Sequence, residues 1–248
     1  MITLYRPSGY DSPRASSFAG RSVDDKPLDA ENGSSFKEID TRRVFRYDKE
    51  NNLWIEQKST TGGAGATEPY IEETYDADGN LIGAKMYGYT KVRDYAFGNC
   101  TNLALTSLPA GVTSIGIEAF INCTNLALTS LPEGLTSIGD GAFTGCSNLA
   151  LTSLPAGVTS IGIEAFAGCS NLALTSLPAD VTSIGNSAFY GCTSLTSITF
   201  KGTPNAIAAN AFNGCTNLTD IKVPWAEGAV ANAPWGATNA TITYNYTE

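Results

Sequence analysis

The sequence predicts a solenoid of six stacked coils, mainly β with one short helical turn in each coil, preceded by a small β meander. Ala-Phe pairs recur every 23 residues, and all six cysteines follow the same period. A fixed period of this size is typical of repeated units that bury their apolar sides against each other. The recurring residues are Phe97, Phe120, Phe143, Phe166, Phe189, Phe212, Cys100, Cys123, Cys146, Cys169, Cys192 and Cys215.

The N-terminal part, residues 1–57, has a different composition. Residues 1–34 are rich in Ser, Pro, Gly and charged residues, which favours an extended arm that becomes ordered against a partner. Short apolar runs between Ser35 and Gln57, separated by turn residues, predict a meander of three antiparallel strands. So small a sheet is marginal alone, so we expect its aromatic residues to anchor the chain to a partner. These candidate anchors are Phe36, Phe45, Tyr47 and Trp54.

Two short segments precede the repeats. Residues 58–67 have the composition of a flexible linker. Residues 68–89 predict a hairpin around an Asp-Gly turn, placed where the array needs a cap. Asp76, Asp78 and Asn80 also have the spacing of a calcium loop, but its twelfth position is Tyr87 instead of Glu, and the hairpin accounts for the same residues.

The repeats occupy residues 90–224, and residues 225–248 are expected to cap the last coil with Trp225 and Trp235. Ala-Phe-x-Gly/Asn-Cys favours a helical turn, with Phe and Cys facing inward together. Leu-Thr-Ser-Leu and Val-Thr-Ser-Ile favour short strands in register with the next coil.

Composition excludes several functions. The chain of 248 residues has 15 Lys and Arg against 24 Asp and Glu, and no Lys or Arg lies between Arg93 and Lys201. Most of the array therefore has no cations with which to bind nucleic acid or an anionic membrane surface. No apolar run approaches the length of a membrane span, and the first residues lack the pattern of a secretory signal.

We expect no enzyme, no cofactor and no metal. The chain has no His, the commonest general base. The cysteines are 23 residues apart, too far for a metal motif, and buried free thiols explain them better than disulfides or metal ligands. The carboxylates of the array are sparse, and Glu118 and Glu164 share one repeat position as solvated rim residues. The others are Asp94, Glu133, Asp140, Asp180 and Asp220.

One row of hydroxyl groups is a candidate binding surface. Threonines at one repeat position are expected to align on an outward face. This hydroxyl ladder could bind a sugar or a protein, although a soluble strand face would show the same residues. The ladder consists of Thr106, Thr129, Thr152 and Thr175.

The phrase Leu-Thr-Ser-Ile-Gly-x-x-Ala-Phe-x-Gly-Cys-Thr/Ser-Asn-Leu resembles the BspA-like leucine-rich repeats of bacterial surface proteins and gut phage proteins. The resemblance covers residues 90–224 and implies a right-handed leucine-rich-repeat solenoid associated with adhesion. The Cys-Thr/Ser-Asn-Leu-Ala-Leu-Thr-Ser-Leu-Pro phrase departs from the common strand pattern, which Leu195–Phe200 retains. Strand register in the repeats is therefore an open question.

Segments within residues 25–55 resemble N-terminal parts of phage structural and fibre-like proteins. Together the two resemblances imply a bacteriophage virion protein, a capsid or tail decoration or fibre, that displays an adhesion module for host attachment. Its expected partners are other virion proteins and a host surface glycan or protein, and it is expected to be a homo-oligomer, plausibly a trimer. The alternative is a bacterial cell-surface adhesin or host-interaction protein with the same repeats.

Overall fold

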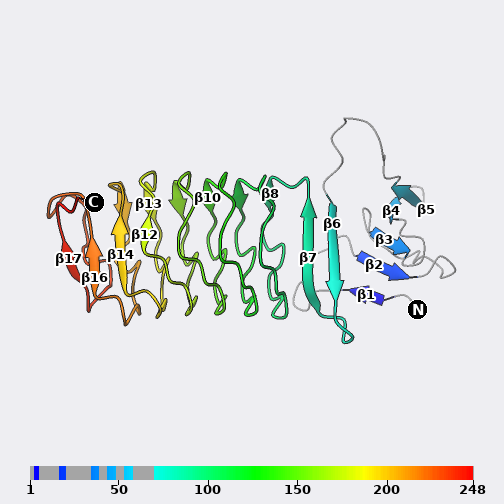
Figure 1. Ribbon diagram of the computed structural model, residues 1–248. Helices are drawn as coiled ribbons and strands as arrows, with labels where there is room; N and C mark the ends of the chain where they lie inside the picture. The colour runs from blue at the N-terminus through cyan, green and yellow to red at the C-terminus, as the bar shows by residue number, and fades with distance from the viewer. Residues whose placement is uncertain are drawn as a thin grey trace. The chain divides into compact units, whose positions relative to one another are not determined.

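The computed structural model describes residues 70–247, with side chains from residue 71, and the backbone of five strands in the N-terminal part (Figure 1). The chain divides into two compact units, residues 1–67 and residues 68–248. No helix long and apolar enough to cross a bilayer is found in the described residues.

The first unit contains one sheet in the order β1-β2-β3-β4-β5, in which only β2 and β3 are parallel. The last three strands form the predicted antiparallel meander. Phe36 lies opposite Phe45 in the ladder, and Tyr47 lies opposite Trp54. The bounds are β1 Thr3–Tyr5, β2 Ser17–Gly20, β3 Ser35–Glu38, β4 Val44–Asp48 and β5 Leu53–Gln57.

Two of these strands, β1 and β2, lie in the segment for which the sequence predicts an arm. The sequence around them contains few apolar residues, so neither a periodic apolar pattern nor a turn motif indicates a strand there. The predicted linker, residues 58–67, lies outside the described residues.

The second unit begins with a hairpin of β6 (Tyr70–Tyr75) and β7 (Leu81–Tyr87). The Asp76 side chain accepts hydrogen bonds from the backbone N–H groups of Asp78 (3.0 Å) and Asn80 (2.8 Å), which closes the turn. These bonds, above all those from Asn80, lower the pKa of the Asp76 carboxyl. Leu81, Ala84 and Met86 are buried in the core of the array.

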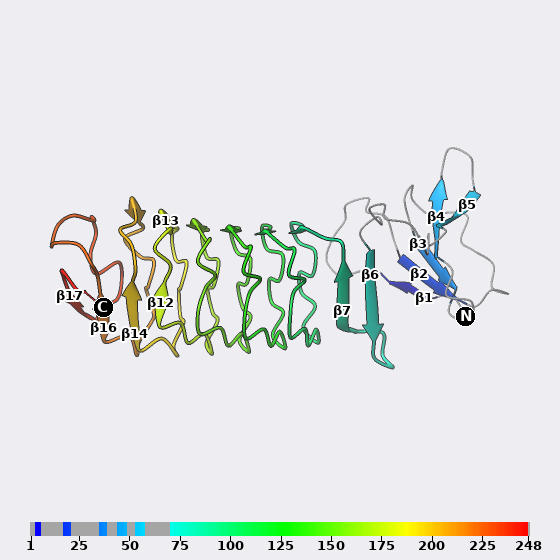
Figure 2. The ribbon, with the colours of Figure 1, turned by 45° about the horizontal axis from the view of Figure 1, so that its top comes forward.

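The repeats stack side by side beyond this hairpin (Figures 1 and 2). The six repeat phenylalanines form one buried column, with neighbouring ring centroids 5.1–5.5 Å apart and ring planes within 8° of parallel. Phe143, in the middle of this column, is fully buried. The predicted stacking of coils around Phe and Leu residues is therefore confirmed.

Two parallel sheets follow different sides of the stack (Figure 1). The six-stranded sheet is built from the Val-Thr-Ser-Ile segments, with Ser137 paired to Ser114 and Ser160 in exact 23-residue register. Its strands are β8 Lys91–Val92, β9 Ser114–Ile115, β10 Ser137–Ile138, β11 Ser160–Ile161, β13 Ser183–Ile184 and β15 Ala206–Ile207.

The second sheet is built from strands of the last coils only. Its strands are β12 Ser176–Leu177, β14 Ser197–Phe200, β16 Asp220–Lys222 and β17 Thr241–Thr243. The first three Leu-Thr-Ser-Leu segments form no strand, contrary to the prediction. The departure from the common repeat phrase falls in these same segments.

The predicted helical turn was wrong. The Ala-Phe segment folds as overlapping turns, because Glu118 (φ 47°) and Asn122 (φ 56°) adopt a left-handed backbone that an α-helix does not contain. Alternate N–H groups bond to the next coil: Phe120 N donates to Ala142 O at 2.8 Å. On the strand side the direction is reversed, and Gly139 N donates to Ile115 O of the preceding coil at 2.9 Å.

Five of the six cysteines are buried, as predicted, and the thiols of these five form no disulfide. Each buried thiol donates to the carbonyl oxygen of the phenylalanine in the preceding coil, at 2.9–3.1 Å. A thiol fits this place because it is small, largely apolar and still a weak donor.

The C-terminal segment continues the stack. Trp225 and Trp235 are buried, and both contact Phe200. The carbonyl of Trp235 accepts the N–H of Phe212 at 2.9 Å, a bond that the alanine of the next coil supplies to each earlier phenylalanine. The segment is therefore a further turn of the solenoid as well as the expected cap.

Candidate functional site

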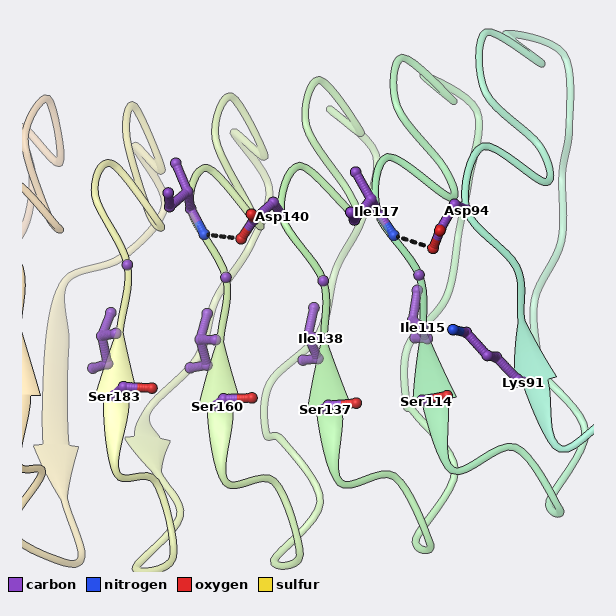
Figure 3. Close-up of a pocket in the computed structure, with 17 residues that line it drawn as sticks. Lys91, Asp94, Ser114, Ile115, Ile117, Ser137, Ile138, Asp140, Ser160 and Ser183 are labelled. Carbon is purple, nitrogen blue, oxygen red and sulfur yellow. Dashed lines mark hydrogen bonds between the residues drawn. The ribbon is translucent and has the colours of Figure 1, made fainter.

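A shallow groove lies over the six-stranded sheet (Figure 3). We call it the sheet groove. It runs across five coils and takes one Ser-Ile pair from each of four neighbouring strands. The isoleucines of these pairs are buried, and the serines are half-buried. Its serines are Ser114, Ser137, Ser160 and Ser183.

A row of glycines lets the coils come close enough to form the groove. A Cβ atom on Gly139 would lie 2.7 Å from the carbonyl carbon of Gly116, and one on Gly162 would lie 2.6 Å from that of Gly139. Any side chain here would force the coils apart. The parallel ladder therefore depends on these glycines, and the serines stay in an even row.

Carboxylates and isoleucines alternate along one wall of the groove. Asp94 and Asp140 lie two coils apart, and Ile117 and Ile163 occupy the same repeat position in the coils that follow them. The Oδ1 atom of Asp94 accepts the N–H of Ile117 at 2.9 Å, and that of Asp140 accepts the N–H of Ile163 at 2.7 Å (Figure 3). Each aspartate thereby fixes the isoleucine after it.

These isoleucines are exposed although the groove is built from core-like sequence. Ile117 is 40% exposed and Ile163 is 48% exposed. Large apolar side chains held in water next to a concave surface are typical of a binding site. Lys91 lies at one end of the groove, and no Lys or Arg lies between Arg93 and Lys201 in the sequence, so the wall from Asp94 onward is acidic.

The four threonines of the hydroxyl ladder lie outside the sheet groove. Its threonines are exposed and lie 23 residues apart, and Thr175 N donates to Thr152 O at 3.3 Å. Within residues 71–247 their hydroxyl groups have no hydrogen-bond partner. In a different row of threonines, the hydroxyl groups donate hydrogen bonds to the preceding coil. For instance, Thr136 Oγ1 donates to Thr113 O at 3.0 Å.

Sequence reasoning missed the groove residues. The sequence signal for these residues is an alternation between neighbouring coils. The second and fourth coils carry Gly-Ile-Glu, whereas the first and third coils carry an aspartate at the position of the isoleucine. The candidate anchors Phe36, Phe45, Tyr47 and Trp54 lie on β3, β4 and β5 of the first unit, and their role as anchors stays a prediction.

The chemistry that these groups support is recognition. Residues 71–247 contain no group of three or more Cys, Asp or Glu side chains placed to hold a metal ion. Burial raises the pKa of the Cys169 thiol to about 12 and that of Cys215 to about 11, so these thiols are poor nucleophiles at neutral pH.

Comparison with known proteins places the repeats in a family. The BspA type leucine-rich repeat region matches residues 90–219, in six copies. No curated protein matches the chain. Solved structures that are similar to it include three leucine-rich repeat proteins. A T. pallidum leucine-rich repeat protein has 29% identity over 62% of this chain and 81% of its own, with a TM-score of 0.48.

A leucine-rich repeat protein from Bacteroides ovatus has 28% identity over 61% of this chain, with a TM-score of 0.50, and the match covers 45% of that protein. A leucine-rich cell surface protein from Faecalibacterium prausnitzii has 23% identity over 78% of this chain and 71% of its own, with a TM-score of 0.40. Because the family match covers more than half of the sequence, this chain belongs to the BspA-type leucine-rich repeat proteins.

Proposed function

We propose that this chain is a non-enzymatic recognition module of a bacterial cell surface, which binds a host partner along the sheet groove. The observation that carries the proposal is the wall of the groove, where exposed Ile117 and Ile163 alternate with Asp94 and Asp140 over consecutive coils. Such a wall offers apolar contact and charge together, without any reactive group.

The groove suits an extended protein partner. Its two isoleucines lie two coils apart, about 10 Å at the spacing of parallel strands. A segment lying along the stack would place aliphatic side chains on them and basic side chains on the aspartates between them. Because interlocked coils hold the groove in place, little conformational entropy is lost when a partner binds.

Family membership supports a cell-surface setting. The BspA-like repeats of this chain resemble those of bacterial surface proteins associated with adhesion. The virion interpretation needs, in addition, the resemblance of residues 25–55 to phage structural proteins, so the cell-surface alternative is the better supported of the two. Labelling intact bacteria and purified phage particles with an antibody against this chain tests it, since signal confined to particles contradicts a surface protein.

Adhesion of host cells to beads coated with the full chain tests the binding face. The double substitution Ile117→Ser and Ile163→Ser is expected to reduce attachment at least about tenfold, because removing two exposed apolar anchors costs more than 1.4 kcal/mol. Folding is expected to survive, since both side chains are exposed.

The matched control replaces the four threonines of the hydroxyl ladder by alanine. This change alters an exposed face of the same coils and leaves the sheet groove intact. If the threonine variant loses attachment and the isoleucine variant keeps it, the hydroxyl ladder is the binding face and the proposal for the groove is wrong.

A further inference from the structure

A second hollow lies on the turn side of the third to fifth coils, around Tyr190. We call it the Tyr190 hollow. Its floor is Gly145, Ala167 and Gly168, and polar side chains stand around the floor. None of its lining residues lines the sheet groove. Its polar lining residues are Thr144, Glu164 and Ser187.

The hollow exists because the repeat changes one residue type. At the position of Gly145 and Gly168, the first two coils carry Asn99 and Asn122, whose side chains are joined by a hydrogen bond of 3.0 Å from Nδ2 to Oδ1. The backbone is left-handed at all four positions. The glycines therefore keep the path of the chain and remove the amides that cover this surface in the first two coils.

Tyr190 forms the far wall and is the most exposed large apolar residue among the described side chains, at 51%. A Cβ atom on Gly214 would lie 3.7 Å from the ring. Since Gly214 has no side chain, nothing from the next coil covers the ring there. An aromatic ring left in water beside a concave surface offers a flat apolar platform with a polar hydroxyl.

The polar groups around the platform still have hydrogen-bonding capacity. Thr144 Oγ1 donates to the carbonyl oxygen of Glu164 at 2.7 Å and keeps its lone pairs. Ser187 Oγ accepts from Asn210 Nδ2 at 3.3 Å and keeps its own hydrogen to donate. The Glu164 carboxylate has no hydrogen-bond or ion-pair partner within residues 71–247. The hollow thus provides acceptors and one donor.

We propose that the Tyr190 hollow is a binding subsite for a neutral sugar. The apolar face of a sugar ring stacks on Tyr190, and its hydroxyl groups donate to Glu164 and Thr144 and accept from Ser187. An apolar peptide side chain would leave the Glu164 carboxylate desolvated without a partner, which is costly. An acidic sugar would meet Glu164 with no cation in this part of the sequence to offset the repulsion.

The site does not depend on the sheet groove, and its variants are different. Tyr190→Ala removes the platform. Tyr190→Phe keeps the ring and removes only its hydroxyl. Gly168→Asn fills the floor with a side chain that the repeat already carries at Asn99 and Asn122, so the backbone tolerates it. Ile117→Ser changes the sheet groove alone and serves as the control.

The test uses the full chain on an array of neutral hexose and N-acetylhexosamine oligosaccharides, with their sialylated counterparts as the acidic arm. Many copies on beads raise a weak interaction to a measurable one. We expect binding to neutral glycans, at least tenfold less binding for Tyr190→Ala and Gly168→Asn, and binding within twofold of the parent for Tyr190→Phe and Ile117→Ser.

Three results would overturn the proposal: no neutral glycan bound above the Tyr190→Ala background, binding that survives Gly168→Asn, or preference for the sialylated arm. If the sugar proposal fails, the proposal for the sheet groove can still hold, because host-cell attachment that requires Ile117 and Ile163 would persist in the Tyr190→Ala variant. Loss of attachment only in the isoleucine variant, with no glycan binding, would therefore separate the two conclusions.

Discussion

The thiol of Cys146 donates a hydrogen bond to the carbonyl oxygen of Phe120, 3.0 Å away in the preceding coil. The same bond recurs in each coil from Cys123 to Cys215. It joins the two residue types that recur every 23 residues, and it gives a carbonyl oxygen inside the core a hydrogen-bond donor. The period in the sequence therefore corresponds to one repeated contact between neighbouring coils.

These thiols predict lower stability at alkaline pH. Burial raises the pKa of Cys169 to about 12 and that of Cys215 to about 11, and it raises the pKa of Cys123, Cys146 and Cys192 as well. In the unfolded chain the thiol pKa is about 9. Between pH 9 and about 11 the unfolded chain loses protons that the folded chain keeps, so the free energy of unfolding falls as pH rises.

The expected loss is about 1.4 kcal/mol for each thiol one pH unit above its unfolded pKa. Urea unfolding of the reduced protein at pH 8, 9 and 10 measures it. The Cys146→Ala variant should be less stable at pH 8 but show a shallower decline, because one titrating group is gone. A midpoint that stays constant from pH 8 to pH 10 would contradict this account.

The phenylalanine column predicts a large cost at its centre. Phe143→Ala removes a fully buried ring that stacks at 5.4 and 5.5 Å on its neighbours, and we expect a loss of about 3–5 kcal/mol. Denaturant unfolding followed by circular dichroism measures it. Phe143→Leu should cost less because it leaves a smaller cavity, and equal stability of Phe143→Ala and the parent would disprove the column as a core.

The close approach of the coils predicts a strict need for glycine. Gly139→Ala places a Cβ atom 2.7 Å from backbone of the preceding coil, which has no flexible end to move aside. We expect a loss of about 1–3 kcal/mol or more in thermal or urea unfolding. Gly134→Ala is the matched control, since its Cβ would meet only a Thr113 methyl group at 3.9 Å. Similar stabilities for the two variants would refute the argument.

The two threonine rows are expected to differ in stability. Thr136→Val removes a hydroxyl that donates to Thr113 O at 3.0 Å, and it should cost at most about 1 kcal/mol because the group is exposed. Thr129→Val changes a hydroxyl with no partner within residues 71–247 and should be close to neutral. Combining Thr136→Val with Thr113→Val and Thr159→Val should enlarge the difference in stability between the two rows. A larger loss of stability for Thr129→Val than for Thr136→Val would contradict this assignment of the bonded and unbonded threonines.

The sequence predicted the stack and its core because both follow from spacing. Phe143, Cys146 and their equivalents are identical in type and position, so burial in one coil implies burial in all. The turn around them was not predictable in the same way. Its left-handed residues include Glu118 and Asn122 as well as glycines, and residue type gives no signal that a glutamate will adopt this conformation.

The binding surfaces were harder to predict than the core because they depend on departures from the repeat. Isoleucine is among the residue types most often buried, yet Ile117 is exposed at the groove, where its N–H donates to Asp94. The Tyr190 hollow depends on glycines that replace asparagine in the third coil and beyond. The hydroxyl ladder follows the repeat, so its residues can be listed from spacing alone, and its use as a binding surface stays a prediction.

The opposed directions of the hydrogen bonds on the two flanks have an electrostatic consequence. Peptide dipoles along an α-helix add up to partial charges at its ends. Here the turn side, where Phe120 donates forward, opposes the strand side, where Gly139 donates backward. The two sets offset each other along the axis. Each coil that is gained or lost carries both sets with it, which limits the partial charge at either end, so the reach of such a module can change while its stacking chemistry stays the same.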